Sequence, residues 1–415
     1  MRCMRCGKEL QKNQCAGCGF DQAAGEYMTV FPLNAAERNP VTEIKPCHYF
    51  LNNELRCANI PRGATKIGES AYAWCKELRE VKIPFGVTEI EEDAFVFCEN
   101  LQEITIPGSV TKIGTNAFRS CTGLQKVVLE EGVSEIGVAA FKGCTSLQEI
   151  SVPESLIHVR KDAFAECIHL KNRNEVIEKS KKNYKQRMIG EKELRFLNVQ
   201  VGENLFEVLE FSDYTVLTRC LKASGKVVIP TGINRKPMVE IEEGAFFECL
   251  DIEEVIIPGG MVRIGEYAFM RCSELRKVTI PLGIIYIGKG AFRGCCSLEK
   301  VAIPGTVIKV GDASFFNCKN LKEIVLENGV GEIGEDAFFG TSLQKVAIPG
   351  SVRKIGESAF SVCTELQTVV ISEGVKEIGE YAFRECTSLR DISIARSVEK
   401  IAENAFAECN EIKFL

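Results

Sequence analysis

The chain has 415 residues, of which 45% are hydrophobic and 26% are charged, and its formal net charge is −6. This acidic balance argues against a nucleic-acid or anionic-lipid surface extending over the whole chain. No apolar run approaches the roughly 18–20 residues that span a bilayer, and the N-terminus lacks the apolar core of a signal peptide. We therefore expect a cytoplasmic protein without a membrane span. The alternative is a cell-surface location reached without a signal peptide.

Two Cys-x-x-Cys pairs, each followed by glycine, lie within residues 1–20. Zinc prefers four tetrahedral ligands, and four thiolates would supply them. The alternatives are cysteines without a function and a redox pair, which is expected beside a βαβ pattern that is absent from this stretch. The spacing predicts a zinc ribbon that holds one structural Zn2+ and depends on the metal for folding. The predicted ligands are Cys3, Cys6, Cys15 and Cys18.

A repeat of 23 residues fills residues 41–172, after a stretch at 21–40 that has no period and is interpreted as a linker. The clearest copy begins at Val110, and the copy that begins at Val133 repeats its marked positions. A fixed period in this range is the mark of a solenoid. The isoleucine position of the repeat falls at Ile44, Ile67, Ile90, Ile113, Ile136 and Val159.

The repeat is interrupted after residue 172. Residues 173–200 are basic and polar, and Ile177, Tyr184 and Met188 fall on one helical face, which predicts a helical linker. Its lysines and arginines form either a solvated face or an anion-binding patch. Residues 201–235 contain two alternating stretches, which predict a hairpin that caps the following array.

The second array, residues 236–415, has the same period and a phenylalanine at every aromatic position. The copy that contains Phe338 is one residue short and lacks the cysteine of the other copies. The two arrays together hold fourteen copies, six before the break and eight after it. The aromatic positions are Phe246, Phe269, Phe292, Phe315, Phe338, Phe360, Phe383 and Phe406.

One copy of 23 residues cannot bury its apolar side chains alone, so the copies must stack on one another. The segment Leu-x-x-Val-x-Ile-Pro predicts a short parallel strand that proline ends. The segment Val-x-x-Ile-Gly turns the chain, and Ala-Phe-x-x-Cys-x-x-Leu is expected to return it as a helical turn. The predicted fold is therefore an α/β solenoid of two arrays, built from short parallel strands plus helical turns and preceded by the zinc ribbon.

Twelve of the 20 cysteines occupy one position of the repeat, for example Cys121 and Cys144. Stacked strands lie roughly 5 Å apart, which is within the reach of a disulfide. A reduced thiol, however, packs well as a small apolar group, and the copy without cysteine needs no bridge. We therefore predict buried free thiols and a reducing compartment.

The full pattern, Val-x-x-Ile-Gly-x-x-Ala-Phe-x-x-Cys-x-x-Leu-x-x-Val-x-Ile-Pro, resembles the BspA-type, or Treponema-type, leucine-rich repeat. The resemblance covers nearly all of Val41–Leu415 except residues 171–200. It implies a bacterial protein with two leucine-rich-repeat arrays. Exported members of that family are surface proteins that bind host matrix proteins or mediate adhesion, so the resemblance also implies a role in protein–protein interaction.

Catalysis has no support in the sequence. His48, His158 and His169 belong to none of the Ser/His/Asp, Cys/His or His-Glu-x-x-His arrangements. The Ile-Gly pairs recur at one register of the repeat, which identifies them as turn residues rather than a phosphate loop. We expect a protein that is not an enzyme.

The outward strand positions of the second array are the predicted working surface. They form a column of small and β-branched side chains flanked by mixed charge, which suggests a protein contact, although such residues are also good strand formers. We expect a non-enzymatic scaffold that binds a protein; the alternatives are a surface adhesin and a zinc-ribbon protein that binds nucleic acid. The column consists of Ile256, Thr279, Ala302, Val325, Ala347, Val370 and Ser393.

Overall fold

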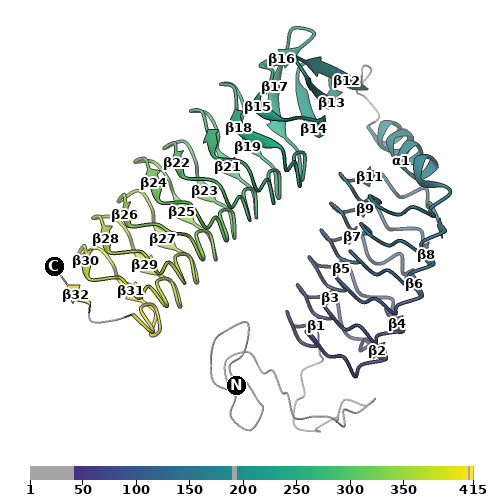
Figure 1. Ribbon diagram of the computed structural model, residues 1–415, viewed down its shortest axis with the longest axis horizontal. Coiled ribbons are helices and arrows are strands. Elements are labelled where there is room, and N and C mark those ends of the chain that lie inside the picture. Colours follow the sequence, from purple (N-terminus) through teal and green to yellow (C-terminus); the bar gives the residue numbers. More distant parts are fainter. Residues whose placement is uncertain (1–41, 189–193, 410–411, 415) are drawn as a thin grey trace. The chain divides into compact units, whose positions relative to one another are not determined.

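The computed structural model describes residues 42–188, 194–409 and 412–414 (Figure 1). The predicted zinc ribbon, with Cys3, Cys6, Cys15 and Cys18, and the predicted linker at 21–40 lie outside the described residues. The chain divides into two compact units, which we call unit 1 (Met1–Ile189) and unit 2 (Gly190–Leu415). Each unit has its own hydrophobic core.

Unit 1 is a stack of coils in which each coil contributes short strands to parallel sheets. One sheet has six strands, and the chain crosses to further sheets of three and two strands on the way to the next coil. The six-stranded sheet consists of β1 (Glu43–Ile44), β3 (Lys66–Ile67), β5 (Glu89–Ile90), β7 (Lys112–Ile113), β9 (Glu135–Ile136) and β11 (His158–Val159). The other strands are β2 (Cys57–Asn59), β4 (Glu80–Lys82), β6 (Glu103–Ile106), β8 (Lys126–Leu129) and β10 (Glu149–Ile150).

Unit 2 repeats this construction with sheets of twelve and nine strands. The first sheet consists of β12 (Arg195–Val201), β13 (Asn204–Glu210), β14 (Thr215–Lys222), β16 (Gly232–Ile233), β17 (Lys236–Ile241), β19 (Arg263–Ile264), β21 (Tyr286–Ile287), β23 (Lys309–Val310), β25 (Glu332–Ile333), β27 (Lys354–Ile355), β29 (Glu377–Ile378) and β31 (Lys400–Ile401). The second consists of β15 (Gly225–Val228), β18 (Ile252–Ile256), β20 (Lys277–Thr279), β22 (Lys300–Ile303), β24 (Glu323–Leu326), β26 (Lys345–Ile348), β28 (Thr368–Ile371), β30 (Asp391–Ile394) and β32 (Lys413–Phe414).

The solenoid has about 15 turns of about 23 residues, against the fourteen copies counted in the sequence. Strand β14 pairs antiparallel with β13 on one side and parallel with β17 on the other. The segment 173–200, interpreted as a helical linker, contains the helix α1 (Arg173–Arg187) and also β12, which is a strand. Strand β14 therefore joins the antiparallel start of unit 2 to its parallel stack.

The strands form because apolar and polar residues alternate. In β22, Val301 and Ile303 are buried whereas Lys300 and Ala302 are exposed, and Pro304 follows the last residue. Successive side chains of a strand point to opposite faces, so one face joins the core and the other meets solvent. The prediction of short parallel strands is confirmed.

The predicted helical turn is wrong. After Ile113 the N–H groups alternate between two acceptors: Ala117 donates to Gly114 of its own coil at 3.2 Å, and Phe118 donates to Ala140 of the next coil at 2.7 Å. An α-helix would keep every such bond within one coil. Asn116 and Ser120 also adopt left-handed φ angles of 54° and 58°, which a right-handed helix excludes. The returning segment is a stack of tight turns, and α1 is the one helix among the described residues.

Identical positions of successive coils stack into columns that make the core. Ile113, Phe118, Cys121 and Leu124 are fully buried, which confirms their prediction as core positions. Ring planes of neighbouring phenylalanines are nearly parallel, and the Phe95 and Phe118 centroids are 5.1 Å apart. The 23-residue period therefore converts each conserved spacing of the sequence into a continuous column of like side chains.

The ladder cysteines join neighbouring coils as hydrogen-bond donors. The thiol of Cys121 donates to the carbonyl of Phe95 and that of Cys144 to the carbonyl of Phe118, both at 3.1 Å. In the short copy, Thr341 occupies the cysteine position, is buried, and donates its hydroxyl to the Phe338 carbonyl at 3.0 Å. The position is thus filled by a small buried donor, which reaches the preceding coil where it is cysteine but bonds within its own coil where it is Thr341.

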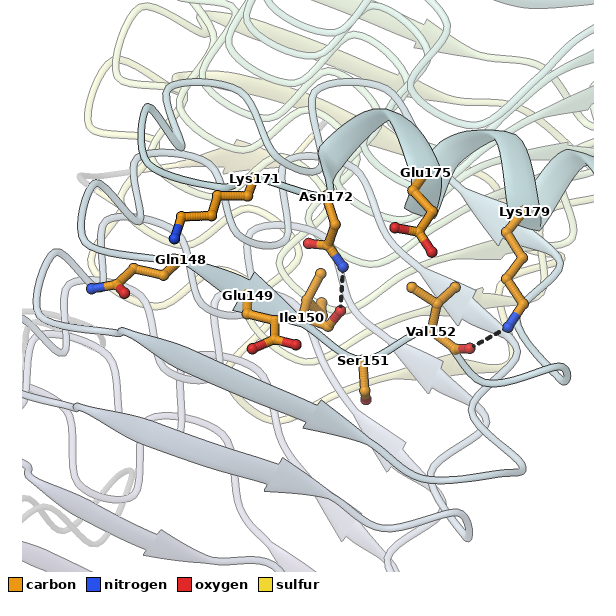
Figure 2. A pocket seen from close by; sticks show the side chains of 9 residues that line it. All are labelled: Gln148, Glu149, Ile150, Ser151, Val152, Lys171, Asn172, Glu175 and Lys179. Atoms are coloured by element: carbon orange, nitrogen blue, oxygen red, sulfur yellow. Dashed lines mark hydrogen bonds between the residues drawn. The ribbon is translucent and has the colours of Figure 1, made fainter.

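Helix α1 closes the end of unit 1. The last coil has carbonyl groups for which no further coil supplies N–H donors, and buried unpaired carbonyls are costly. Asn172 donates to Ile150 O and Lys179 to Val152 O, both at 2.8 Å (Figure 2). Asn183 donates to Leu156 O at 3.0 Å. The buried residues of α1 are accordingly Val176, Ser180 and Asn183 rather than the apolar face expected from the sequence.

Candidate protein-binding surfaces

The seven residues predicted as a contact surface lie on seven successive strands, from β18 to β30. Strand pairing places Ile256 beside Thr279, Ala302 beside Val325, and Ala347 beside Val370. Thr279, Ala302, Val325, Ala347 and Val370 are exposed, whereas Ile256 and Ser393 are half-buried. We call this set of seven residues the strand-face column. The structure brings all seven predicted residues together into one line of small and β-branched side chains.

A second column, two residues earlier on each strand, carries charges that neutralise one another. Glu254 lies 3.2 Å from Lys226 and 3.3 Å from Lys277, and Lys300 lies 2.6 Å from Glu323. Hydrogen bonds from Lys226 and then Lys277 lower the pKa of Glu254. The strand-face column is therefore bordered by mixed charge rather than by a continuous basic or acidic strip.

An aliphatic patch on unit 2 was not predicted from the sequence. Val262, Ile285 and Ile308 each lie two residues before the buried isoleucine or valine that ends the short strand of their coil. Backbone hydrogen bonds link the three residues in consecutive coils. The exposed fractions are 43% for Val262, 41% for Ile285 and 66% for Ile308, and Leu282 of the middle coil is 70% exposed. We call these four residues the aliphatic patch. Several large apolar side chains exposed together commonly mark a contact surface.

The same position of unit 1 is polar. There Thr65 donates its hydroxyl to Thr42 O at 2.8 Å, and Thr88 donates to Thr65 O at 3.0 Å. Comparing this one position between the two arrays would have revealed the patch, because the first four coils of unit 1 carry threonine there and the first four of unit 2 carry valine or isoleucine. The change removes hydrogen bonds from the surface and exposes hydrocarbon.

A polar pocket of about 460 Å3 lies between β10 and α1 (Figure 2). Its walls include the side chains of Glu149, Lys171 and Glu175, together with Asn172 and Lys179, which close the end of the solenoid. The donors of the last two residues are already engaged with backbone carbonyls. The pocket is the space beside the end cap, and it holds no nucleophile with an adjacent base.

The titratable groups of unit 1 form ion pairs rather than a reactive constellation. Glu135 lies 3.1 Å from Nε of Arg160 and 3.5 Å from Nζ of Lys112. Burial raises the pKa of Glu135, but the charges of Arg160 and Lys112 outweigh burial and hold the pKa at about 2. The ring of His158 lies 4.9 Å from that of Tyr184. Each of these contacts links residues of different coils or of a coil and the cap.

Within residues 42–188, 194–409 and 412–414, no group of three or more His, Cys, Asp or Glu side chains has the arrangement of a metal site. The described part of the chain also contains no helix with the length and apolarity needed to cross a membrane.

Comparison with solved structures returns leucine-rich repeat proteins. One from Bacteroides ovatus is 24% identical, covers 90% of this chain and 88% of its own, and has a TM-score of 0.42. A leucine rich cell surface protein from Faecalibacterium prausnitzii is 28% identical over 80% of this chain and 77% of its own, with a TM-score of 0.36. The leucine rich repeat protein of T. pallidum is 27% identical over 50% and 82%, with a TM-score of 0.36. No curated protein matches the chain.

The model of the BspA type leucine rich repeat region matches residues 42–171, 239–366 and 285–413. These matches span well over half of the chain and coincide with the stacked coils of both units. They confirm the resemblance carried by the repeat pattern. The chain belongs to the BspA-type leucine-rich repeat family.

Proposed function

We propose that the protein is a non-enzymatic scaffold that binds a protein partner through the strand-face column of unit 2. The observation that carries the proposal is the alignment of seven small and β-branched side chains, five of them exposed, in one line across successive strands. Small and β-branched side chains have few rotamers to immobilise, so little conformational entropy is lost when a partner covers this surface.

The flanking charges favour a protein over a nucleic acid. Phosphate backbones bind to surfaces whose lysines and arginines release counterions along a continuous strip. Here Lys277 and Lys300 are each held by a carboxylate, of Glu254 and Glu323 respectively. Mixed charge around an apolar centre is the usual composition of a protein interface with its polar rim.

The test uses a triple substitution on the strand-face column, Ala302→Glu, Val325→Glu and Ala347→Glu. A tagged full-length chain first captures its partner from native lysate, and mass spectrometry identifies it. Burying three carboxylates in the contact should then weaken binding of that purified partner by at least about 100-fold, because each unpaired buried charge costs several kcal/mol.

The matched control changes the aliphatic patch instead, by Val262→Thr, Ile285→Thr and Ile308→Thr. Threonine is the residue that unit 1 carries at this position, where its hydroxyl bonds to the preceding coil, so the fold should persist. Binding that survives the strand-face substitutions and fails in this control would move the contact to the aliphatic patch and refute the strand-face proposal.

We further propose that the thiolates of Cys3, Cys6, Cys15 and Cys18 hold one structural zinc ion. The support is their spacing, which provides the four ligands of a tetrahedral site. Metal analysis of the purified full-length chain is expected to give one zinc per chain, lost in the Cys3→Ser, Cys6→Ser double variant. A wild-type chain purified in the presence of zinc that still contains none would contradict the proposal.

A further inference from the structure

The two units end in different ways. At the end of unit 1, side chains of α1 bond to the open carbonyls of the last coil. At the start of unit 2, β12 is the first strand of its sheet, and among the described residues no strand pairs with its outer edge. An edge strand presents a row of N–H and C=O groups that can template pairing with another chain.

The outer edge of β12 is regular along its whole length. All seven residues pair with β13 without a register shift, from Arg195 opposite Glu210 to Val201 opposite Asn204. Apart from the charged Arg195 at its first position, β12 lacks the features that usually protect an edge, since it contains no proline, lysine or bulge. The outer edge of β12 can therefore pair with another strand.

The hairpin turn decides which backbone groups face outward. Val201 and Asn204 flank a two-residue loop in which Gly202 has a φ of 59°, the arrangement of a type II′ turn. The residues that flank such a loop form a hydrogen-bonded pair, and hydrogen-bonded and non-hydrogen-bonded pairs then alternate along the ladder. The N–H and C=O groups of Asn198 and Gln200 consequently point to the outer edge.

The side chains of β12 suit a sheet that continues beyond it. Val199 and Val201 pack against the core of unit 2, and Leu197 is half-buried on the same face, whereas Asn198 and Gln200 are exposed. A strand added to the outer edge would extend the apolar face over Leu197 and leave the polar residues in solvent.

We propose that β12 pairs antiparallel with β12 of a second copy of this chain, with the two-fold axis at Asn198. This register is the one in which all seven residues of both strands pair. It places Leu197 against Val199 of the second copy, and Arg195 against Val201 of the second copy, so that no like charges face each other. The outward N–H and C=O groups of Asn198 then form a reciprocal pair across the axis.

The second copy is the proposed occupant because β12 then pairs over its full length, with Leu197 against Val199 and its one charged residue, Arg195, opposite an uncharged one. A single pair of strands buries less surface than the about 1,200–2,000 Å2 of a stable interface. The dimer is therefore expected to form reversibly and to depend on protein concentration.

Sedimentation velocity of the full-length chain, from about 1 μM to about 1 mM, tests the proposal with two substitutions at one residue. Asn198→Thr keeps the N–H group and should dimerise like the wild type. Asn198→Pro removes the outward N–H group, which β13 does not use, and should raise the dimer dissociation constant more than about tenfold.

A third variant covers the case in which proline disturbs β12 itself. Asn198→Lys keeps the backbone intact but sets two like charges face to face at the axis, and it too should weaken the dimer. A wild-type chain that stays monomeric over the whole range overturns the proposal, as does a dimer that Asn198→Lys leaves unchanged.

Discussion

Above pH 9 the protein is expected to lose stability by about 1.4 kcal/mol per pH unit for each ladder thiol whose pKa is raised by burial. Burial raises the pKa of Cys75 to about 12 and the pKa values of Cys167 and Cys363 to about 11. In the unfolded chain these thiols ionise near pH 9. The stabilisation is therefore complete below pH 9 and is lost as the pH rises through 9 toward 11–12.

The expected loss of unfolding free energy is large because the contributions of the individual thiols add. At pH 11, four such thiols would remove up to about 11 kcal/mol, which is comparable with the roughly 5–15 kcal/mol of a whole domain. Urea titrations at pH 7, 8, 9 and 10, with a reductant present to prevent disulfide formation, should show a stability that is constant to pH 9 and then falls steeply.

The control for this prediction removes one thiol. Cys144 is fully buried, and burial together with the neighbouring thiols of Cys121 and Cys167 raises its pKa. Cys144→Ala should cost about 1–2 kcal/mol at pH 7 through lost packing and a lost hydrogen bond. The slope above pH 9 should be shallower than that of the wild type by about 1.4 kcal/mol per pH unit. Equal slopes would show that the thiols do not control alkaline unfolding.

Replacing an internal rung of the phenylalanine column should be the most damaging single substitution in unit 2. Phe292 is fully buried, and its ring stacks on Phe269 and Phe315 with centroid distances of 5.1 Å on both sides. Phe292→Ala should destabilise unit 2 by about 3–5 kcal/mol from the cavity alone, with up to about 1.5 kcal/mol more for each lost ring pair. Urea unfolding followed by circular dichroism measures the loss.

Two comparisons inside the same chain control for this result. Phe406 stacks on Phe383 at 5.3 Å and is only half-buried, so Phe406→Ala should cost less than half as much as Phe292→Ala. Trp74 is the single tryptophan and lies in unit 1, so its fluorescence follows unit 1, which has its own core. The prediction is contradicted if Phe292→Ala shifts the fluorescence transition of unit 1 as far as the transition seen by circular dichroism. It is also contradicted if Phe292→Ala and Phe406→Ala lower the free energy of unfolding equally.

The columns of the core could be predicted from the sequence because stacking repeats one environment 23 residues apart. Ile113 lies between Ile90 and Ile136, so the requirement for an apolar, β-branched side chain recurs at every copy. The outward strand positions followed from the same argument, since alternation leaves only one face for Ala302 and Val325.

The returning turns could not be predicted in this way. The spacing Phe118-x-x-Cys121-x-x-Leu124 is also that of a helical face, and the apolar period alone does not distinguish the two. The two structures differ in the acceptors of the backbone N–H groups. The N–H group of Phe118 bonds to the next coil, and the sequence of one copy does not reveal that bond. The sequence does carry a weak indication of the turns. The first residue of each coil with a left-handed φ angle is often one that tolerates positive φ. Such residues are Asp93, Asn116, Asp162, Gly244, Gly290 and Asp336.

The aliphatic patch was missed for a different reason. Its position in the repeat contributes to the core in neither array. The repeat therefore does not constrain the residue there, and no single residue type recurs at it throughout both arrays. Only the contrast between Thr65 or Thr88 in unit 1 and Ile285 or Ile308 in unit 2 reveals the exposed hydrocarbon. In a solenoid, residues that distinguish one copy from another carry the information on binding.

The hydrogen bonds between coils point both ways along the stacking direction. Gly137 donates back to Ile113 O at 2.8 Å, whereas Phe118 donates forward to Ala140 O at 2.7 Å. In an α-helix all peptide dipoles align, and partial charges of about half an electron accumulate at the two ends. In this solenoid the opposed bonds largely cancel, as they do in sheets. Adding or deleting a coil therefore changes the length of the array without building an electrostatic potential at its ends, which leaves copy number free to vary.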